Sequence, residues 1–241
     1  MTNPDTIWPD DITETRHAFP GGSGASNAPR DVPWFRPPIP HWQTSAVVIG
    51  AGIAGLCAAR ALQSRGFTVT VLEAGETPFP EASGNPAAIV EPQVAISGVG
   101  RAFHEAAFLH ARRLYRDLGV YEACGSHHLA PDDKSRARFA KIVKHDLRPE
   151  PLFEAADDGG LLVPDAGMVQ PPVLGSLLAR GVDLRFGSRV TGLEQGTGKR
   201  WHITLSGGKT VDTGTVIVAA GVGSAVFPQA AFLPLKARHG Q

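Results

Sequence analysis

Three glycines and one glutamate are the residues whose spacing most clearly indicates chemistry. Gly50, Gly52 and Gly55 follow the pattern G-x-G-x-x-G directly after an apolar run. In this pattern the first glycine permits a tight turn, the second lets the backbone approach a pyrophosphate, and the third lets a helix pack closely on a strand. The pyrophosphate accepts hydrogen bonds from amides at the positive end of the helix. Glu73, 23 positions after Gly50, is placed to accept from a ribose 2′-hydroxyl and would repel a 2′-phosphate.

The segments around these residues predict a β–α–β unit. Residues 46–49 are wholly apolar, as expected of a parallel strand that is buried on both faces. Residues 54–65 carry small and apolar side chains at helical spacing, and Gly66 fits the positive φ of a helix C-terminal cap. Residues 68–72 predict a second strand that ends at Glu73. A glycine-rich turn in an unrelated α/β fold is the alternative, and this strand–helix–acid context favours a dinucleotide site over it.

A second apolar run lies far downstream. Residues 215–221, Thr-Val-Ile-Val-Ala-Ala-Gly, resemble the strand and turn with which many FAD proteins contact the dinucleotide a second time. Any buried strand that ends in glycine gives this pattern, so it counts only together with the first motif. The pair favours FAD over NAD as the cofactor.

Apolar periodicity predicts the other elements. Helices are expected at residues 99–118, 132–145 and 171–180, the last with proline in its first turn, where the missing N–H is harmless. Short strands are expected at residues 182–186, 189–193, 201–205 and 215–219. The fold class that follows is α/β, with a Rossmann-like βαβ unit.

The chain divides into an arm and one domain. Residues 1–44 hold eight of the twenty prolines and a Gly-Gly-Ser-Gly run, which predicts a linker or a poorly ordered arm. Residues 45–241 are expected to form an FAD-binding domain with an inserted, mixed α+β substrate region. The FAD-binding parts are expected at about 45–95 and 165–230, and the inserted region at about 96–164.

Three segments between the two motifs resemble the D-amino-acid-oxidase-like family of flavoproteins. Residues 82–88, Ala-Ser-Gly-Asn-Pro-Ala-Ala, resemble the family's loop after the second strand, which faces the FAD phosphates and flavin ring. Residues 167–172 resemble its glycine-to-proline entry into a helix, and residues 182–193 a hairpin whose valine backbone bonds the adenine. The motifs and the resemblance together imply FAD as cofactor, with these contacts: Gly50, Gly52, Ile53, Ala54, Gly55, Glu73, Ala74, Ser83, Asn85, Ala87, Ala88, Val190, Ala220 and Gly221.

Within this family, the chain resembles the oxidoreductase domain of bifunctional enzymes that modify the wobble uridine of tRNA. The resemblance runs from about residue 45 to 241, and its particular signs are the Ile-Val-Glu-Pro run at 89–92 and the Arg-rich helix that ends near Tyr115. It implies FAD-dependent removal of the glycine-like arm of 5-carboxymethylaminomethyluridine, or its 2-thio form, as glyoxylate, which leaves aminomethyluridine. Arg238 resembles a residue beside the flavin and is a candidate cation for the substrate carboxylate, although a solvated tail arginine fits equally well. No other catalytic residue is predicted.

Two departures from the family leave alternatives open. The methyltransferase half of the bifunctional enzymes is absent, so no S-adenosylmethionine chemistry is assigned. Family members continue well beyond Gln241, so we expect the domain to be incomplete at its C-terminus. The alternatives are a small-amino-acid oxidase or dehydrogenase of the glycine, sarcosine or D-amino-acid type, and a truncated, inactive dinucleotide-binding module.

Composition excludes several other classes. No apolar run is long enough to span a membrane, and the N-terminus lacks the apolar core of a secretory signal, so a cytoplasmic protein is expected. Cys57 and Cys124 show neither CxxC nor zinc-ligand spacing. His127 and His128 should point to opposite faces of a strand, so no metal site is predicted.

Charge gives a mixed indication about partners. Lys plus Arg and Asp plus Glu are 23 each, so the whole chain shows no attraction to nucleic acid or membrane. Residues 101–148 hold ten Lys or Arg against six acidic residues, which could bind RNA if they shared one face. Two ordinary solvated helix faces explain the same count. The predicted partner is therefore tRNA or a small amine or amino acid, with no prediction of oligomeric state.

Overall fold

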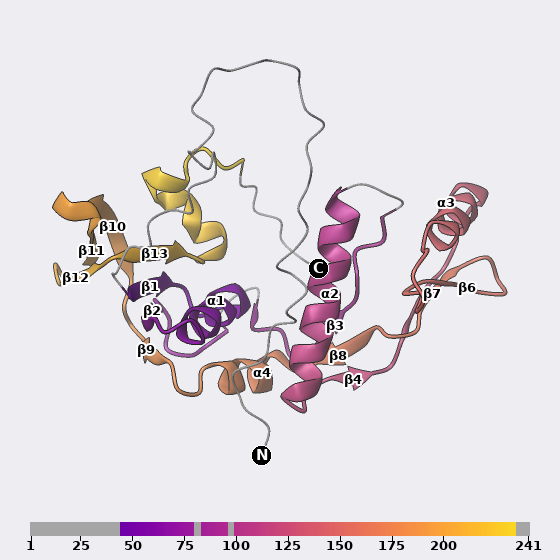
Figure 1. The fold of residues 1–241 in the computed structure, drawn as a ribbon, viewed down its shortest axis with the longest axis horizontal. Coiled ribbons are helices and arrows are strands. Elements are labelled where there is room, and N and C mark those ends of the chain that lie inside the picture. Colours follow the sequence, from indigo (N-terminus) through magenta and orange to yellow (C-terminus); the bar gives the residue numbers. More distant parts are fainter. Residues whose placement is uncertain (1–43, 80–82, 96–98, 235–241) are drawn as a thin grey trace, which may run out of the picture.

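A four-stranded parallel sheet organises one part of the chain (Figure 1). The computed structural model describes residues 44–79, 83–95 and 99–234, so Arg238 and all but the last residue of the predicted arm lie outside it. The sheet has the order β13-β1-β2-β9, with β1 at Ser45–Ile49, β2 at Thr68–Leu72, β9 at Asp183–Arg185 and β13 at Thr215–Val218. Helix α1 (Ile53–Gln63) follows β1, and α4 (Pro171–Leu178) precedes β9. We call residues 44–79 and 170–234 the Rossmann-like part.

Both faces of the central strand are buried. Ala46 and Val48 of β1 belong to a core cluster that also contains residues of α1 and α4. Val47 and Ile49 belong to a second cluster on the other face, with residues of a separate antiparallel sheet. Because successive side chains of a strand point to opposite faces, an apolar environment on both sides requires an uninterrupted apolar run. The predicted buried strand is confirmed, and with it the Rossmann-like α/β fold.

The antiparallel sheet of the Rossmann-like part corrects one prediction. It has the order β10-β11-β12, with β10 at Val190–Gln195, β11 at Trp201–Leu205 and β12 at Thr210–Thr213. A hairpin was expected over residues 182–193, and this is wrong, since β9 pairs in parallel with β2 while β10 belongs to the other sheet. The reason lies in the connection: Gly187 N donates to Gly75 O and Ser188 N to Glu73 O. The chain thus continues past the end of β2 instead of reversing.

Residues 83–169 form what we call the inserted region. Its helices are α2 (Val99–Asp117) and α3 (Asp133–Lys144). One antiparallel sheet has the order β3-β8-β4, with β3 at Ala88–Val90, β8 at Gly167–Val169 and β4 at Glu122–Ala123. Another has the order β5-β7-β6, with β5 at Ser126–His128, β7 at Leu161–Val163 and β6 at Glu154–Ala155. The three predicted helices are confirmed, α4 ending two residues early, whereas these two- and three-residue strands were not predicted.

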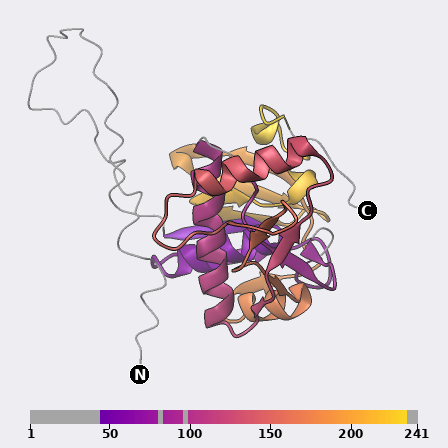
Figure 2. The same ribbon diagram turned by 90° about the vertical axis from the view of Figure 1, so that its right-hand side faces the viewer.

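Helix α2 takes part in the cores of both parts. Tyr115, near its C-terminal end, is buried in the cluster shared with α1, α4 and the parallel sheet. Phe108, two turns earlier, is buried in a cluster with Phe139 and Ile142 of α3. Figure 2 shows α3 lying across α2. The inserted region therefore packs onto the Rossmann-like part through α2.

Among the residues that the structure places, no helix combines the length and apolarity needed to cross a membrane.

Candidate functional site

The turn after β1 can be built only with glycine at its first position. Gly50 has φ of +104°, in the left-handed region, and a Cβ atom there would lie 2.5 Å from the backbone oxygen of Ala219. Its amide donates to Leu72 O at 2.8 Å, which ties the turn to the end of β2. Gly50 therefore closes a sharp bend that lies against the turn after β13.

The other two glycines shape the start of α1. A Cβ at Gly55 would lie 1.9 Å from the backbone oxygen of Gly50, so only glycine lets helix and bend approach this closely. A Cβ at Gly52 would lie 3.3 Å from Ser83 Oγ, and that hydroxyl accepts from Ile53 N at 3.3 Å. Helix α1 has neither a side-chain cap nor an acidic residue in its first turn. Its positive end therefore faces Ser83 across the space that a side chain at position 52 would enter, which suits an anion.

Glu73 is buried beside this bend. Its Oε2 accepts from Ala51 N and its Oε1 from Gly75 N, both at 2.7 Å, and the residue is 6% exposed. A carboxylate has about four acceptor sites. Two of them are thus used by the backbone, and about two are left for hydroxyl donors. The side chain points to the bend, as a ribose contact requires, and it also holds the bend in place, a role that the sequence analysis missed.

A cleft of about 450 Å³ runs along these groups. Ten of the fourteen predicted cofactor contacts line it: Gly50, Gly52, Ile53, Ala54, Glu73, Ala74, Ser83, Val190, Ala220 and Gly221. They come from the bend and the start of α1, the end of β2, the segment before β3, the start of β10 and the turn after β13. The structure thus brings segments from both ends of the domain to one cavity.

The other four predicted contacts lie outside this lining. Gly55 is buried against the bend, and Asn85 and Ala87 are exposed in the segment before β3. Ala88 begins β3 and pairs with Val169 of β8. The cleft is lined in addition by residues that were not predicted, among them Ser188, Arg189, Val222, Val226 and Phe227. Only Arg189 and Val222 are direct sequence neighbours of a predicted contact, Val190 and Gly221 respectively.

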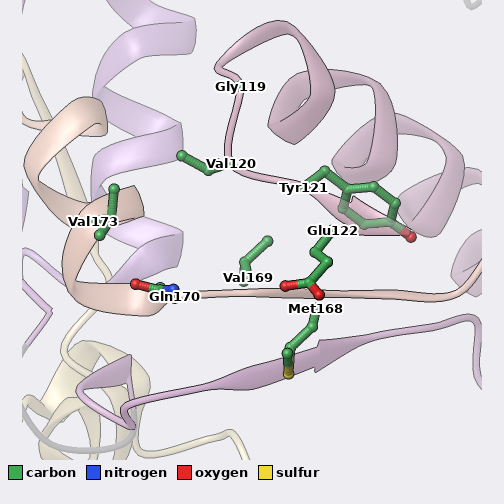
Figure 3. Close-up of a pocket in the computed structure, with 8 residues that line it drawn as sticks. All are labelled: Gly119, Val120, Tyr121, Glu122, Met168, Val169, Gln170 and Val173. Atoms are coloured by element: carbon green, nitrogen blue, oxygen red, sulfur yellow. The ribbon is translucent and has the colours of Figure 1, made fainter. Parts of the chain in front are cut away.

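A second, smaller cavity lies in the inserted region, at its border with α4. It measures about 290 Å³ and is lined by Gly119, Val120, Tyr121, Glu122, Met168, Val169, Gln170 and Val173. The polar side chains of Glu122 and Gln170 lie along β8 with Val169 between them (Figure 3). Tyr121 donates its hydroxyl proton to Asp165 O at 2.5 Å. None of the predicted contacts lies here.

Histidines and cysteines of the described segments form no metal site. His127 and His128 face different acids, Asp158 at 3.2 Å and Glu91 at 3.1 Å, in agreement with their expected opposite orientation. No cluster of three or more His, Cys, Asp or Glu suited to a metal occurs in residues 44–79, 83–95 and 99–234. Cys57 is half-buried and burial raises the pKa of its thiol, whereas Cys124 is exposed.

The parallel sheet, the glycine bend at the start of α1 and the acid at the end of β2 define a dinucleotide-binding α/β protein. A family model described as "FAD dependent oxidoreductase", abbreviated DAO, matches residues 45–241. The chain belongs to this family, the D-amino-acid-oxidase-like FAD-dependent oxidoreductases, as its motifs predicted.

Curated relatives confirm the finer resemblance. The chain is 33% identical, over 97% of its length, to the tRNA 5-methylaminomethyl-2-thiouridine biosynthesis bifunctional protein MnmC of Pseudomonas savastanoi pv. phaseolicola. It is 34% identical over 84% of its length to the MnmC protein of Hahella chejuensis. It spans only 36% of either relative.

Solved structures share the fold. L-amino acid deaminase from Proteus vulgaris matches with a TM-score of 0.64 and 21% identity, over 78% of this chain and 50% of that one. Glycine oxidase from Bacillus cereus matches with a TM-score of 0.60 and 20% identity, over 77% of this chain and 57% of that one. At this identity the likeness concerns the fold alone.

Proposed function

We propose that this chain binds FAD and takes part in oxidising a secondary amine, the carboxymethylaminomethyl group on the wobble uridine of tRNA. The observation that carries the cofactor is the bend at Gly50, closed by the buried Glu73 carboxylate over the start of α1. The tRNA substrate is supported by the similarity to the MnmC proteins, whose name refers to biosynthesis of a tRNA thiouridine.

The residues of the cleft fit a dinucleotide by their chemistry. The amides at the start of α1 would hold the diphosphate, and Glu73 would accept from the ribose hydroxyls. Ser83 Oγ now accepts from Ile53 N, so it stands where it could donate to a phosphate oxygen. The backbone of Val190, which also lines the cleft, would contact the adenine. Ala220 and Gly221, with the apolar Val222 and Val226, would shield one side of the bound group from water.

The flavin supplies the redox chemistry when bound, since it accepts a hydride from the carbon next to the substrate nitrogen. The substrate's loss of that hydride and a proton leaves a C=N bond, which water hydrolyses to glyoxylate and the primary amine. What the protein must add is orientation and a cation for the substrate carboxylate. Arg238 was predicted as that cation; it lies outside the described residues, and its role stays a prediction.

The cofactor is tested first. We expect the purified chain to be yellow, or to become so with FAD, and to quench the fluorescence of added FAD. Gly52→Leu, which puts a side chain between α1 and Ser83, should weaken FAD binding at least about tenfold. Gly100→Leu is the matched control, because a Cβ at this helical glycine would meet no neighbouring atom within 4 Å. This variant should bind FAD as the wild type does. A colourless chain that never binds FAD would favour an inactive module.

The substrate is tested separately. The FAD-loaded chain is incubated with tRNA that carries carboxymethylaminomethyluridine, with unmodified tRNA, and with glycine and sarcosine. We expect glyoxylate, together with aminomethyluridine in the nucleoside digest, from the modified tRNA alone. Turnover of glycine or sarcosine, with none of the tRNA, would replace this proposal by a small-amino-acid oxidase.

A further inference from the structure

We propose that the outward face of α3 is the surface on which the tRNA backbone docks. Its basic stripe consists of Lys134, Arg138, Lys141 and Lys144, all exposed. The inference rests on the proposed tRNA substrate and names the part of the chain that would hold it. RNA presents a regular array of negative phosphates, and cations that neutralise them release counterions and so favour binding.

The four cations lie on one side of the helix. With 3.6 residues per turn, positions 134, 138 and 141 fall at i, i+4 and i+7, and position 144 lies on the flank of the same face. Phe139 and Ile142, which lie outside the stripe, are the buried residues of this helix. The fold therefore fixes which way this helix points, and the stripe is turned to solvent.

Three of the four arginines of α2 form ion pairs within the chain, in contrast to the cations of the α3 stripe. Arg101 pairs with Glu105 at 2.6 Å, and Arg148, just beyond α3, pairs with the same carboxylate. Arg112 and Arg116 both pair with Asp165. Of the ten cations counted in residues 101–148, these four are therefore already engaged with carboxylates of the chain itself.

The stripe itself has little opposing charge. Asp133 is the one acidic residue within α3, and it pairs with Arg136, which lies off the stripe. Arg138 donates to the backbone oxygen of Val94 at 2.7 Å, and that acceptor carries no opposing charge. Within the part of the chain that the structure describes, the side-chain ammonium groups of Lys134, Lys141 and Lys144 form no hydrogen bond or ion pair. Their fields add, as a polyanion-binding surface requires.

Helix stability does not explain the stripe. Lysines near a helix C-terminus, such as Lys141 and Lys144, interact favourably with the helix dipole by about 0.3–1 kcal/mol each. Lys134 lies in the first turn, where the same dipole disfavours a cation. A purely structural role would therefore not place a lysine at both ends of one face.

The test is a salt titration of tRNA binding by the FAD-loaded chain. The stripe variant is Lys134→Gln, Lys141→Gln and Lys144→Gln, because glutamine keeps good helix propensity. The matched control changes three exposed cations of the Rossmann-like part, Arg180, Arg200 and Lys209, to glutamine. Arg200 directly precedes β11 and Lys209 directly precedes β12, two strands at the opposite end of the molecule from α3 (Figure 1). Thermal unfolding and FAD affinity are measured for every variant.

We expect the stripe variant to bind tRNA at least about tenfold more weakly near 0.1 M salt, with a salt slope reduced by about 2–3. The tRNA affinity of the control should stay within about twofold of the wild type. A variant in which the same three lysines are replaced by arginine should bind tRNA as the wild type does. Since phosphate contacts carry no sequence information, the stripe variant should lose the same factor in affinity for modified and for unmodified tRNA.

Two results would overturn the inference in distinguishable ways. Equal salt slopes for the wild type and the stripe variant would refute α3 as the docking surface and leave the tRNA substrate standing. If the wild-type chain binds FAD but binds no tRNA at any salt concentration, both the proposed tRNA substrate and the docking surface on α3 are refuted.

Discussion

The Rossmann-like part and the inserted region both have an apolar core but differ in their other contacts. Around Gly50 and Gly55 the decisive contacts join backbone atoms, and a single added Cβ would come within 2.5 Å of a carbonyl oxygen. In the inserted region the corresponding contacts join charged side chains, such as Arg101 and Glu105. The first kind admits one residue type at a given position, whereas the second needs only opposite charges that happen to meet in space.

The largest expected effect distinguishes a glycine at which a Cβ would clash with backbone, Gly55, from a glycine at which it would not, Gly100. Gly55→Ala places a Cβ 1.9 Å from Gly50 O, so the bend must move, and we expect a loss of about 4 kcal/mol or more in unfolding free energy. Gly100→Ala, in the first turn of α2, meets nothing within 4 Å and should stabilise the chain by about 0.5–1 kcal/mol. Urea unfolding measures both. Equal effects would mean that the backbone contact at Gly55 is not decisive.

The ionic contacts of the inserted region come next. Glu105→Gln leaves the buried Arg101 and the partly buried Arg148 without their shared carboxylate, and should cost about 3 kcal/mol. Asp133→Asn breaks the exposed pair with Arg136 and should cost less than about 1 kcal/mol. If urea unfolding shows both changes to be equally mild, the buried network does not hold the inserted region.

A pH titration examines the junction between the parts. Burial raises the pKa of Tyr115, in the shared core, to about 12 from an ordinary value near 10. The folded state therefore keeps its phenol proton where the unfolded chain loses it. Stability from this group is complete below pH 10 and falls between pH 10 and 12, by up to about 2.7 kcal/mol. Tyr115→Phe should lose less stability over that window, and an identical decline in both proteins would contradict the assignment.

The smallest effect concerns the two thiols. Burial raises the pKa of Cys57 in α1, whereas Cys124 is exposed in the inserted region. A thiol reagent should label Cys124 rapidly and Cys57 at least about tenfold more slowly. Cys124→Ser should abolish the fast phase; if the fast phase survives, α1 opens more readily than its packing indicates.

This difference in contacts also explains what could be predicted from the sequence. The roles of Gly50 and Gly55 were predictable because backbone proximity excludes every other residue. Strands β1 and β2 were predictable from their apolar runs. By contrast, β3 to β8 are two or three residues long and show no periodicity, so they were missed.

Side-chain partners of the inserted region were not predictable in the same way. Arg101 was counted among candidate surface cations, yet it is 8% exposed, because its partner Glu105 carries the opposite charge on the same helix face. The expected hairpin at residues 182–193 does not form, because β9 pairs with β2, a strand far away in the sequence, and local sequence patterns do not reveal such a partner. Arg189 and Val226 reach the cleft through that same tertiary arrangement.

Helix α2 has a further consequence, since its middle and its C-terminal end are buried in different cores. Amides of β7 in the inserted region exchange with solvent only when their core opens, and that opening would also displace α2 from the Rossmann-like part. A ligand that stabilises the folded cleft should thus slow hydrogen exchange at Leu161 and Val163, which it never touches. Through this helix, ligand binding in the cleft of the Rossmann-like part would become measurable as slower hydrogen exchange in the inserted region.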